Sequence, residues 1–181
     1  MNKAILICIK PKWCAKIMNG EKTIEVRTSK ALANAIQKLI NEYGYADICA
    51  YCSKSNYLGY ISNKYVGKVI FKFRCYKVEK YPYISDRYDK LIGSCLSEKE
   101  LLDYSTIKEE NGIRFVKTIY TIHISKLEIF DRPRELNEFY TTKLDEDLTK
   151  RFDNSIQLEN KTWVKPITKA PQNFCYCEVL K

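Results

Sequence analysis

Residues 20–27 read Gly-Glu-Lys-Thr-Ile-Glu-Val-Arg, and this stretch joins a helix pattern to a strand pattern. Side chains alternate between the two faces of a strand, so the polar residues of this strand share one face and the apolar residues share the other. The polar face carries Thr23, Glu25 and Arg27. Lys22 lies at the turn before the strand, where the backbone can direct its side chain to the same face. A solvated strand whose Glu and Arg merely pair at the surface, at little energetic gain, is the alternative.

The elements around this stretch are marked by their end signals. The apolar, β-branched run Ala4–Ile9 predicts a buried strand. Pro11 then opens a helix at the position where its missing N–H has no cost, and Gly20 closes it. Ser29 is an N-cap and Gly44 a C-terminal stop for a second, strongly amphipathic helix.

Further elements are predicted downstream. We expect strands at Ala46–Cys52, Val66–Val78, Ile113–Ile129 and Phe174–Leu180. We expect a helix after Ser97, which forms a capping box with Glu100, a charged turn at Lys108–Gly112, and short helices at Pro133–Tyr140 and Asp145–Phe152. Strands interleaved with short helices, without a regular βαβ rhythm, predict an α+β fold with a mostly antiparallel, curled sheet. We expect one domain over residues 1–181.

Composition favours an anionic partner. The chain has 31 Lys and Arg against 22 Asp and Glu, a net charge of +9, and 45% hydrophobic residues. A basic surface attracts polyanions such as RNA, although a surplus of solvated lysine gives the same count. No apolar run approaches the roughly 20 residues of a membrane span, and none is a signal-peptide core. We therefore expect a cytoplasmic protein without a membrane partner.

The eight cysteines are expected to be reduced thiols. Cys49-x-x-Cys52 and Cys175-x-Cys177 could supply four thiolates to zinc. Residues i and i+3 of a strand point to opposite faces, however, and no Gly-rich knuckle surrounds either pair. His123 is the only histidine and has no evident partner. We expect no metal and no cofactor.

Three separated stretches carry a resemblance to a known family. A strand, a Pro-opened helix and Gly20-x-Lys22-x-x-Glu25-x-Arg27 resemble the signature of ASCH domains, which are relatives of the PUA fold. Residues 124–139 are similar to the family's segment before its last strands. Residues 165–176, with Pro-Gln before an aromatic residue, resemble its ending. The middle of the chain, 81–111, matches nothing in the family.

The resemblance implies a small, curled or closed PUA-like β-barrel flanked by short helices, with the signature residues lining a cleft. It implies binding of RNA or nucleotides. Some members resemble amidohydrolases acting on N4-acetylcytidine, with a catalytic lysine, threonine and glutamate, and some are reported as nucleases. Lys22 matches that lysine, but Glu25 stands in place of the threonine. A carboxylate there favours the charged form of Lys22, so the sequence favours binding over catalysis.

The candidate site residues follow from both arguments. For RNA or nucleotide binding they are Lys22, Thr23, Glu25, Arg27, Tyr51 and Lys54. If the protein is an enzyme, the catalytic candidates are Lys22, Glu25 and Glu79. Tyr51 and Lys54 belong to a stretch in which tyrosines alternate with lysines, an arrangement that stacks bases and follows a phosphate backbone. Burial of a strand tyrosine in the core is the alternative. The sequence leaves protein partners open.

Overall fold

A computed structural model gives the structure of the protein and describes residues 3–54, 59–82, 88–110, 113–143, 156–157 and 163–179. The chain forms two compact units. The first unit comprises Met1–Cys14, Asp47–Lys72 and Glu128–Lys181, and the second comprises Ala15–Ala46 and Phe73–Leu127. The chain passes between the units after Cys14, Ala46, Lys72 and Leu127. Neither unit is a continuous segment, and the expected single domain stays a prediction.

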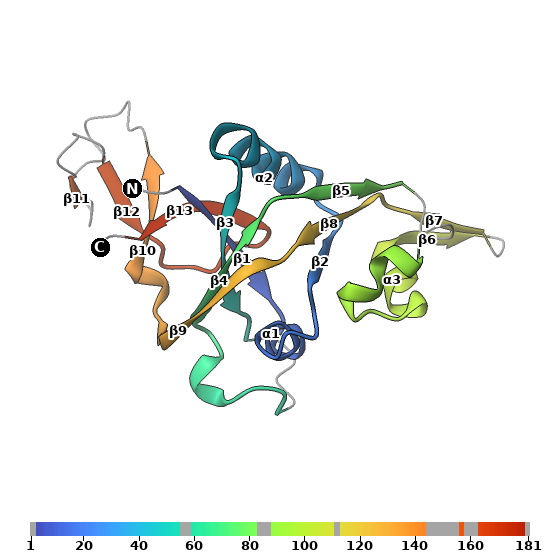
Figure 1. Ribbon diagram of the computed structural model, residues 1–181, viewed down its shortest axis with the longest axis horizontal. Helices are drawn as coiled ribbons and strands as arrows, with labels where there is room; N and C mark the ends of the chain where they lie inside the picture. Colours follow the sequence, from blue (N-terminus) through green and yellow to red (C-terminus); the bar gives the residue numbers. More distant parts are fainter. Residues whose placement is uncertain are drawn as a thin grey trace. The chain divides into compact units, whose positions relative to one another are not determined.

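The first unit is built on an eight-stranded mixed sheet in the order β11-β12-β10-β13-β1-β3-β4-β9 (Figure 1). Its strands are β1 (Ala4–Ile9), β3 (Ala46–Cys52), β4 (Val69–Cys75), β9 (Ser125–Arg134), β10 (Phe139–Lys143), β11 (Ile156–Gln157), β12 (Trp163–Pro166) and β13 (Phe174–Val179). Strand β1 pairs parallel with β3 and antiparallel with β13. Ile5, Leu6 and Ile7 are fully buried, as a continuous apolar run in the middle of a sheet requires.

Short helical segments connect these strands. Helix α1 (Pro11–Met18) begins in the first unit and ends in the second, and the 3₁₀ turns η1 (Asn63–Tyr65) and η3 (Leu136–Glu138) belong to the first.

No helix among the described residues is both long and apolar enough to cross a membrane. None of the eight cysteines forms a disulfide, and the described residues contain no group of three or more potential metal ligands.

The second unit holds the candidate site. Its three-stranded antiparallel sheet has the order β2-β8-β5, from β2 (Ile24–Arg27), β8 (Ile119–His123) and β5 (Val78–Tyr81). Helix α2 (Lys30–Tyr43) follows β2, with Ser29 Oγ accepting from the Leu32 amide at 3.2 Å and Gly44 left-handed at φ 80°. The remaining elements are η2 (Tyr88–Ser94), α3 (Glu98–Ser105) and the paired strands β6 (Thr106–Glu110) and β7 (Ile113–Val116).

A separate apolar cluster holds the sheet of the second unit against its helices. Ile24 and Val26 of β2 pack with Leu91 of η2 and Leu101 of α3, both of which are fully buried. Helix α3 begins with the expected capping box: the Glu100 amide donates to Ser97 Oγ at 3.1 Å. Elements η2 and α3, which belong to the segment that matched nothing in the family, therefore cover one face of the sheet that carries the signature strand.

Several predictions are confirmed and others are wrong. Strands Ala4–Ile9 and Ala46–Cys52 and both caps of α2 are as expected. The expected turn at Lys108–Gly112 includes strand β6, because residues 106–110 pair with β7. Val66–Val78 divides between β4 and β5, and Ile113–Ile129 divides among β7, β8 and β9. The helix expected at Asp145–Phe152 lies outside the described residues.

Pro133 does not start a helix. It lies near the end of β9, which is an edge strand of the eight-stranded sheet. A proline lacks the N–H that an inner ladder needs, but an edge strand tolerates that loss. Only a short 3₁₀ turn, Leu136–Glu138, follows before strand β10.

The α+β class is confirmed, but no sheet of the described residues closes into the expected barrel. The eight-stranded sheet ends at β11 on one side and at β9 on the other. After β4 the chain continues into β5, and β8 precedes β9, so the segments that follow β4 and precede β9 pair with each other in a second sheet, as β5 and β8.

Candidate functional site

A tight turn after α1 brings Lys22 to the start of β2. Gly20 adopts φ 77°, a left-handed conformation that costs glycine little, and its amide donates to the Ile17 carbonyl at 3.0 Å. The amides of Glu21 and Lys22 both donate to the Lys16 carbonyl, at 2.9 and 3.0 Å. These bonds satisfy the last carbonyls of the helix and fix the chain's exit direction.

Lys22 is a buried lysine, with only 2% of its surface exposed. Its Nζ donates to the backbone carbonyl of Ser94 at 2.7 Å and lies 3.4 Å from Glu25 Oε2. An ammonium group is costly to bury unless it is paired and hydrogen-bonded, and here both conditions are met. The carbonyl comes from the last residue of η2, so this hydrogen bond connects η2 to the start of the signature strand β2.

Glu25 lies between two cations. Its Oε2 faces Lys22, and its Oε1 lies 3.0 Å from Arg27 Nε. The side chain of Glu25 is 7% exposed and that of Arg27 is 17% exposed, so Arg27 is the most accessible of the three. Ion pairs in such surroundings are weakly screened by solvent and hold a fixed geometry. The three signature side chains thus form one network of two basic groups and one carboxylate.

Thr23 contributes its backbone to this arrangement. Its amide donates to the Gly93 carbonyl at 2.8 Å, and its carbonyl accepts from the Ile124 amide at 2.9 Å. A Cβ at Gly93 would lie 2.4 Å from Thr23 Oγ1 and 3.2 Å from Ile24 Cδ1. Only glycine allows η2 to approach β2 this closely, which is what places the neighbouring Ser94 carbonyl within reach of Lys22.

The strand register places Glu79 on the opposite face of the sheet from Glu25. In an antiparallel pair, residues directly opposite one another share a face. Glu25 is opposite Ile122, which is opposite Val78. Glu79 is opposite Thr121 and therefore shares the other face. The structure brings Lys22, Glu25 and Arg27 together but does not bring Glu79 to them.

Glu79 instead forms a polar cluster of its own. Its Oε1 lies 2.9 Å from Lys77 Nζ, and its Oε2 lies 2.8 Å from His123 Nε2. Hydrogen bonding to Lys77 is the main cause that lowers the pKa of the Glu79 carboxyl, with a smaller contribution from His123. His123 therefore has a partner, which the sequence did not reveal, because the contact joins β8 to a residue 44 positions earlier.

Tyr51 and Lys54 belong to the first unit. Tyr51 is 6% exposed in the core cluster of that unit, and burial is the main cause that raises the pKa of its phenol. Lys54 is exposed, with its aliphatic stem beside Gly67. The buried ring of Tyr51 agrees with the alternative of a strand tyrosine in the core, and presents no face for stacking a base.

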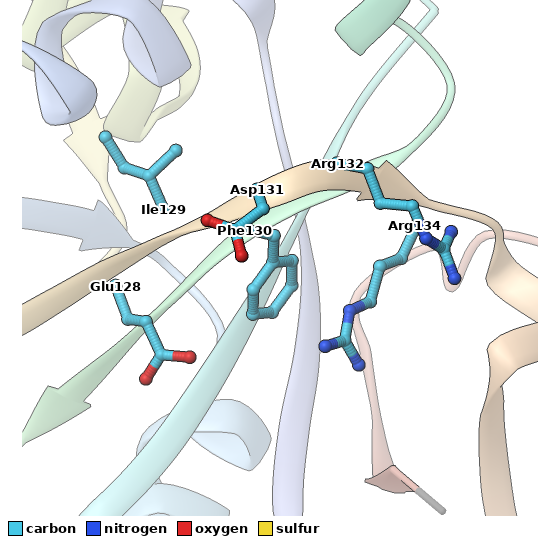
Figure 2. Close-up of a pocket in the computed structure, with 6 residues that line it drawn as sticks. All are labelled: Glu128, Ile129, Phe130, Asp131, Arg132 and Arg134. Carbon is cyan, nitrogen blue, oxygen red and sulfur yellow. The ribbon is translucent and has the colours of Figure 1, made fainter. Parts of the chain in front are cut away.

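A cavity of about 430 Å³ lies elsewhere, along β9 in the first unit (Figure 2). It is lined by Glu128, Ile129, Phe130, Asp131, Arg132 and Arg134. Figure 2 shows the Phe130 ring beside the guanidinium of Arg134, which lies 4.6 Å from the ring centroid. Arg132 pairs with both carboxylate oxygens of Glu138, at 2.9 and 2.6 Å. The paired charges favour a stabilising role for this strand.

Sequence reasoning missed the contribution of Gly93 and Ser94. A backbone carbonyl leaves no sequence signal, because every residue has one. The only indication was a glycine inside a segment that matched no family pattern.

Solved structures share the fold of this chain. The ASCH protein of Zymomonas mobilis is 16% identical, with a TM-score of 0.52 over 98% of this chain and 87% of that one. A variant with one Ser replaced by Ala gives 15% identity and 0.53 over 98% and 88%, and one with a Tyr replaced by Phe gives 17% and 0.51 over 99% and 91%. No family model and no curated protein matches the chain. The resemblance to ASCH domains is thus confirmed at the level of the fold, over almost the whole chain.

Proposed function

From this ASCH fold, we propose that the protein binds RNA or a nucleotide at Lys22, Glu25 and Arg27. The observation that carries the proposal is the position of Glu25, held between the two cations. In this role Lys22 anchors the site to Ser94, while Arg27, the most exposed of the three, meets the ligand. A guanidinium suits phosphate oxygens, and a carboxylate accepts hydrogen bonds from base amino groups.

The geometry favours binding over the amidohydrolase and nuclease alternatives. A general base or nucleophile needs an available lone pair. The Nζ of Lys22 donates to a backbone carbonyl and pairs with a carboxylate, so it is already engaged within the protein. Glu79, the third residue of the catalytic set, lies on the other face of the sheet. The net charge of +9 also favours a phosphate-bearing ligand.

Titration of a fluorescently labelled single-stranded RNA tests the proposal. We expect Arg27→Gln to weaken binding at low salt and to reduce the slope of log K against log salt by about 0.7 for each phosphate that the variant no longer neutralises. Arg27→Lys should restore only part of the affinity, because an ammonium cannot form the two parallel hydrogen bonds of a guanidinium.

The matched control is the double variant Lys38→Ala, Lys99→Ala. It is compared with the site double variant Lys22→Ala, Arg27→Ala, which removes two positive charges from the site. The control removes the same number of charges from exposed positions on α2 and α3. Circular dichroism should verify that each protein is folded. If both double variants weaken RNA binding equally, the effect is one of net charge and the proposed site is wrong. Absence of RNA binding at low salt would also refute the proposal.

A further inference from the structure

A second cationic and aromatic cluster lies in the same unit as the candidate site, formed by Tyr45, Arg74, Tyr76 and Lys126. Tyr45 directly precedes β3, Arg74 lies near the end of β4 and Tyr76 directly follows that strand, and Lys126 lies at the start of β9. These three strands are neighbours in the sheet order. Arg74 and Tyr76 both contact the ring of Tyr45, so they lie on the same side of the strand end.

The two tyrosine rings and the two cations contact one another. The ring centroids of Tyr45 and Tyr76 are 6.2 Å apart, with their planes tilted by 55°. The guanidinium of Arg74 lies 4.2 Å from the Tyr45 centroid, and the ammonium of Lys126 lies 5.9 Å from that of Tyr76. These separations are typical of aromatic pairs and of cation–π contacts.

The cluster presents its aromatic surface and its charge to solvent. Tyr76 is 42% exposed and Lys126 is exposed. Tyr45 and Arg74 are half-buried and support the exposed side chains from beneath. The local potential is positive: hydrogen bonding to Lys126, then to Arg74, lowers the pKa of the Tyr76 phenol. The cluster thus offers a π surface beside cations to anything that binds there.

The backbone at Lys126 is unusual. Its φ of 45° lies in the left-handed region, which a non-glycine residue rarely adopts. Such a conformation persists only when the surrounding structure holds it, and it occurs preferentially at binding sites. Here the left-handed residue is itself one of the two cations of the cluster.

We propose that Tyr76, supported by Tyr45 and flanked by Arg74 and Lys126, forms a platform on which unpaired bases of single-stranded RNA stack while the two cations contact the backbone. Sequence-tolerant single-strand binding combines aromatic stacking with cations that follow the phosphates. Base faces are not accessible in an RNA duplex, so the platform selects single strands. This inference rests on the proposed binding of RNA and specifies the form of RNA bound.

The test compares a labelled decauridylate with a labelled triuridylate by fluorescence anisotropy. We expect Tyr76→Ala to weaken decamer binding by about tenfold, as the loss of one stacked base implies. Tyr76→Phe should keep the affinity, because the π surface remains. The matched control is Tyr104→Ala, which removes a tyrosine of similar exposure, 46%, from α3 of the same unit and should have no effect.

A second readout is independent of affinity. In Tyr76→Trp, stacking of uracil should quench the fluorescence of the new indole, and an equal-length RNA duplex should not. Quenching in Tyr76→Trp together with weakening in Tyr76→Ala supports the platform. Unchanged decamer binding in Tyr76→Ala refutes it.

The outcomes also separate this inference from the proposed function. If Arg27→Gln weakens the triuridylate and Tyr76→Ala leaves the decamer unchanged, the platform alone is wrong. If Tyr76→Ala weakens the decamer and Arg27→Gln changes neither ligand, the candidate site is wrong and the platform stands. Absence of RNA binding by the unaltered protein refutes both.

Discussion

At the scale of single residues, the position of Glu25 determines what the candidate site can do. A carboxylate that faces two cations is stable in a buried setting because each charge compensates another. If Glu25 becomes neutral, two cations remain near each other with no anion between them. Glu25, at which the resemblance predicts a threonine in amidohydrolase-like members, is therefore the residue that compensates both cations of the site.

Glu25→Gln should lower the free energy of unfolding by about 3–5 kcal/mol, because breaking a buried ion pair leaves uncompensated charge. Urea denaturation measures the change. Glu21→Gln is the matched control: Glu21 pairs with Lys16 at 3.0 Å, but its side chain is 51% exposed and the pair is screened. We expect no measurable change there. A loss in Glu25→Gln as small as that of the control would contradict a stabilising network.

At the scale of elements, the second unit uses the two faces of one small sheet differently. One face of β2 carries Glu25 and Arg27, and the other packs Ile24 and Val26 against η2 and α3. The second face also carries Glu79, with its partners Lys77 and His123. Two polar clusters thus lie on opposite faces of the same three strands.

The Glu79 cluster should make stability depend on pH. The pKa of Glu79 is lower in the folded protein than its ordinary value of 4.5. Its contribution is therefore fully present above pH 4.5 and is lost as the pH falls through the folded-state pKa. We expect the free energy of unfolding of the unaltered protein to exceed that of Glu79→Gln at pH 6, and the difference to shrink below pH 4.5. A pH-independent difference would contradict this linkage.

At the scale of the whole molecule, the two units share one chain that passes between them repeatedly. Helix α1 and strand β4 each contain residues of both units. A unit made of discontinuous segments cannot form until distant parts of the chain meet. Because α1 and β4 are common to both units, the folding of one unit is coupled to the folding of the other.

We expect the protein to unfold in a single cooperative transition. The two tryptophans, Trp13 and Trp163, both lie in the first unit, so their fluorescence reports on that unit. Helices α2 and α3 lie in the second unit and dominate the far-ultraviolet circular dichroism at 222 nm. Coincident urea transitions by the two probes would agree with one domain over residues 1–181. Two separate midpoints would show that the units unfold independently.

Local signals in the sequence determined much of this protein. Helix α2 was predictable because Ser29 and Gly44 mark its ends by chemistry that acts within a few residues. Strand β1 and the capping box of α3 were predictable for the same reason. The grouping of Glu25 with Arg27 also follows from alternation along one short strand.

Only the tertiary structure decided which distant groups meet. The Ser94 carbonyl that holds Lys22 is 72 residues away, and Glu79 was separated from Glu25 by strand register. The pairing of Glu79 with His123, and the meeting of Tyr45, Arg74, Tyr76 and Lys126 at three strand ends, depend on the same long-range pairing. Periodicity specifies which face of its own strand a residue occupies. It does not specify which strand will be its neighbour, because that depends on the packing free energy of the whole chain.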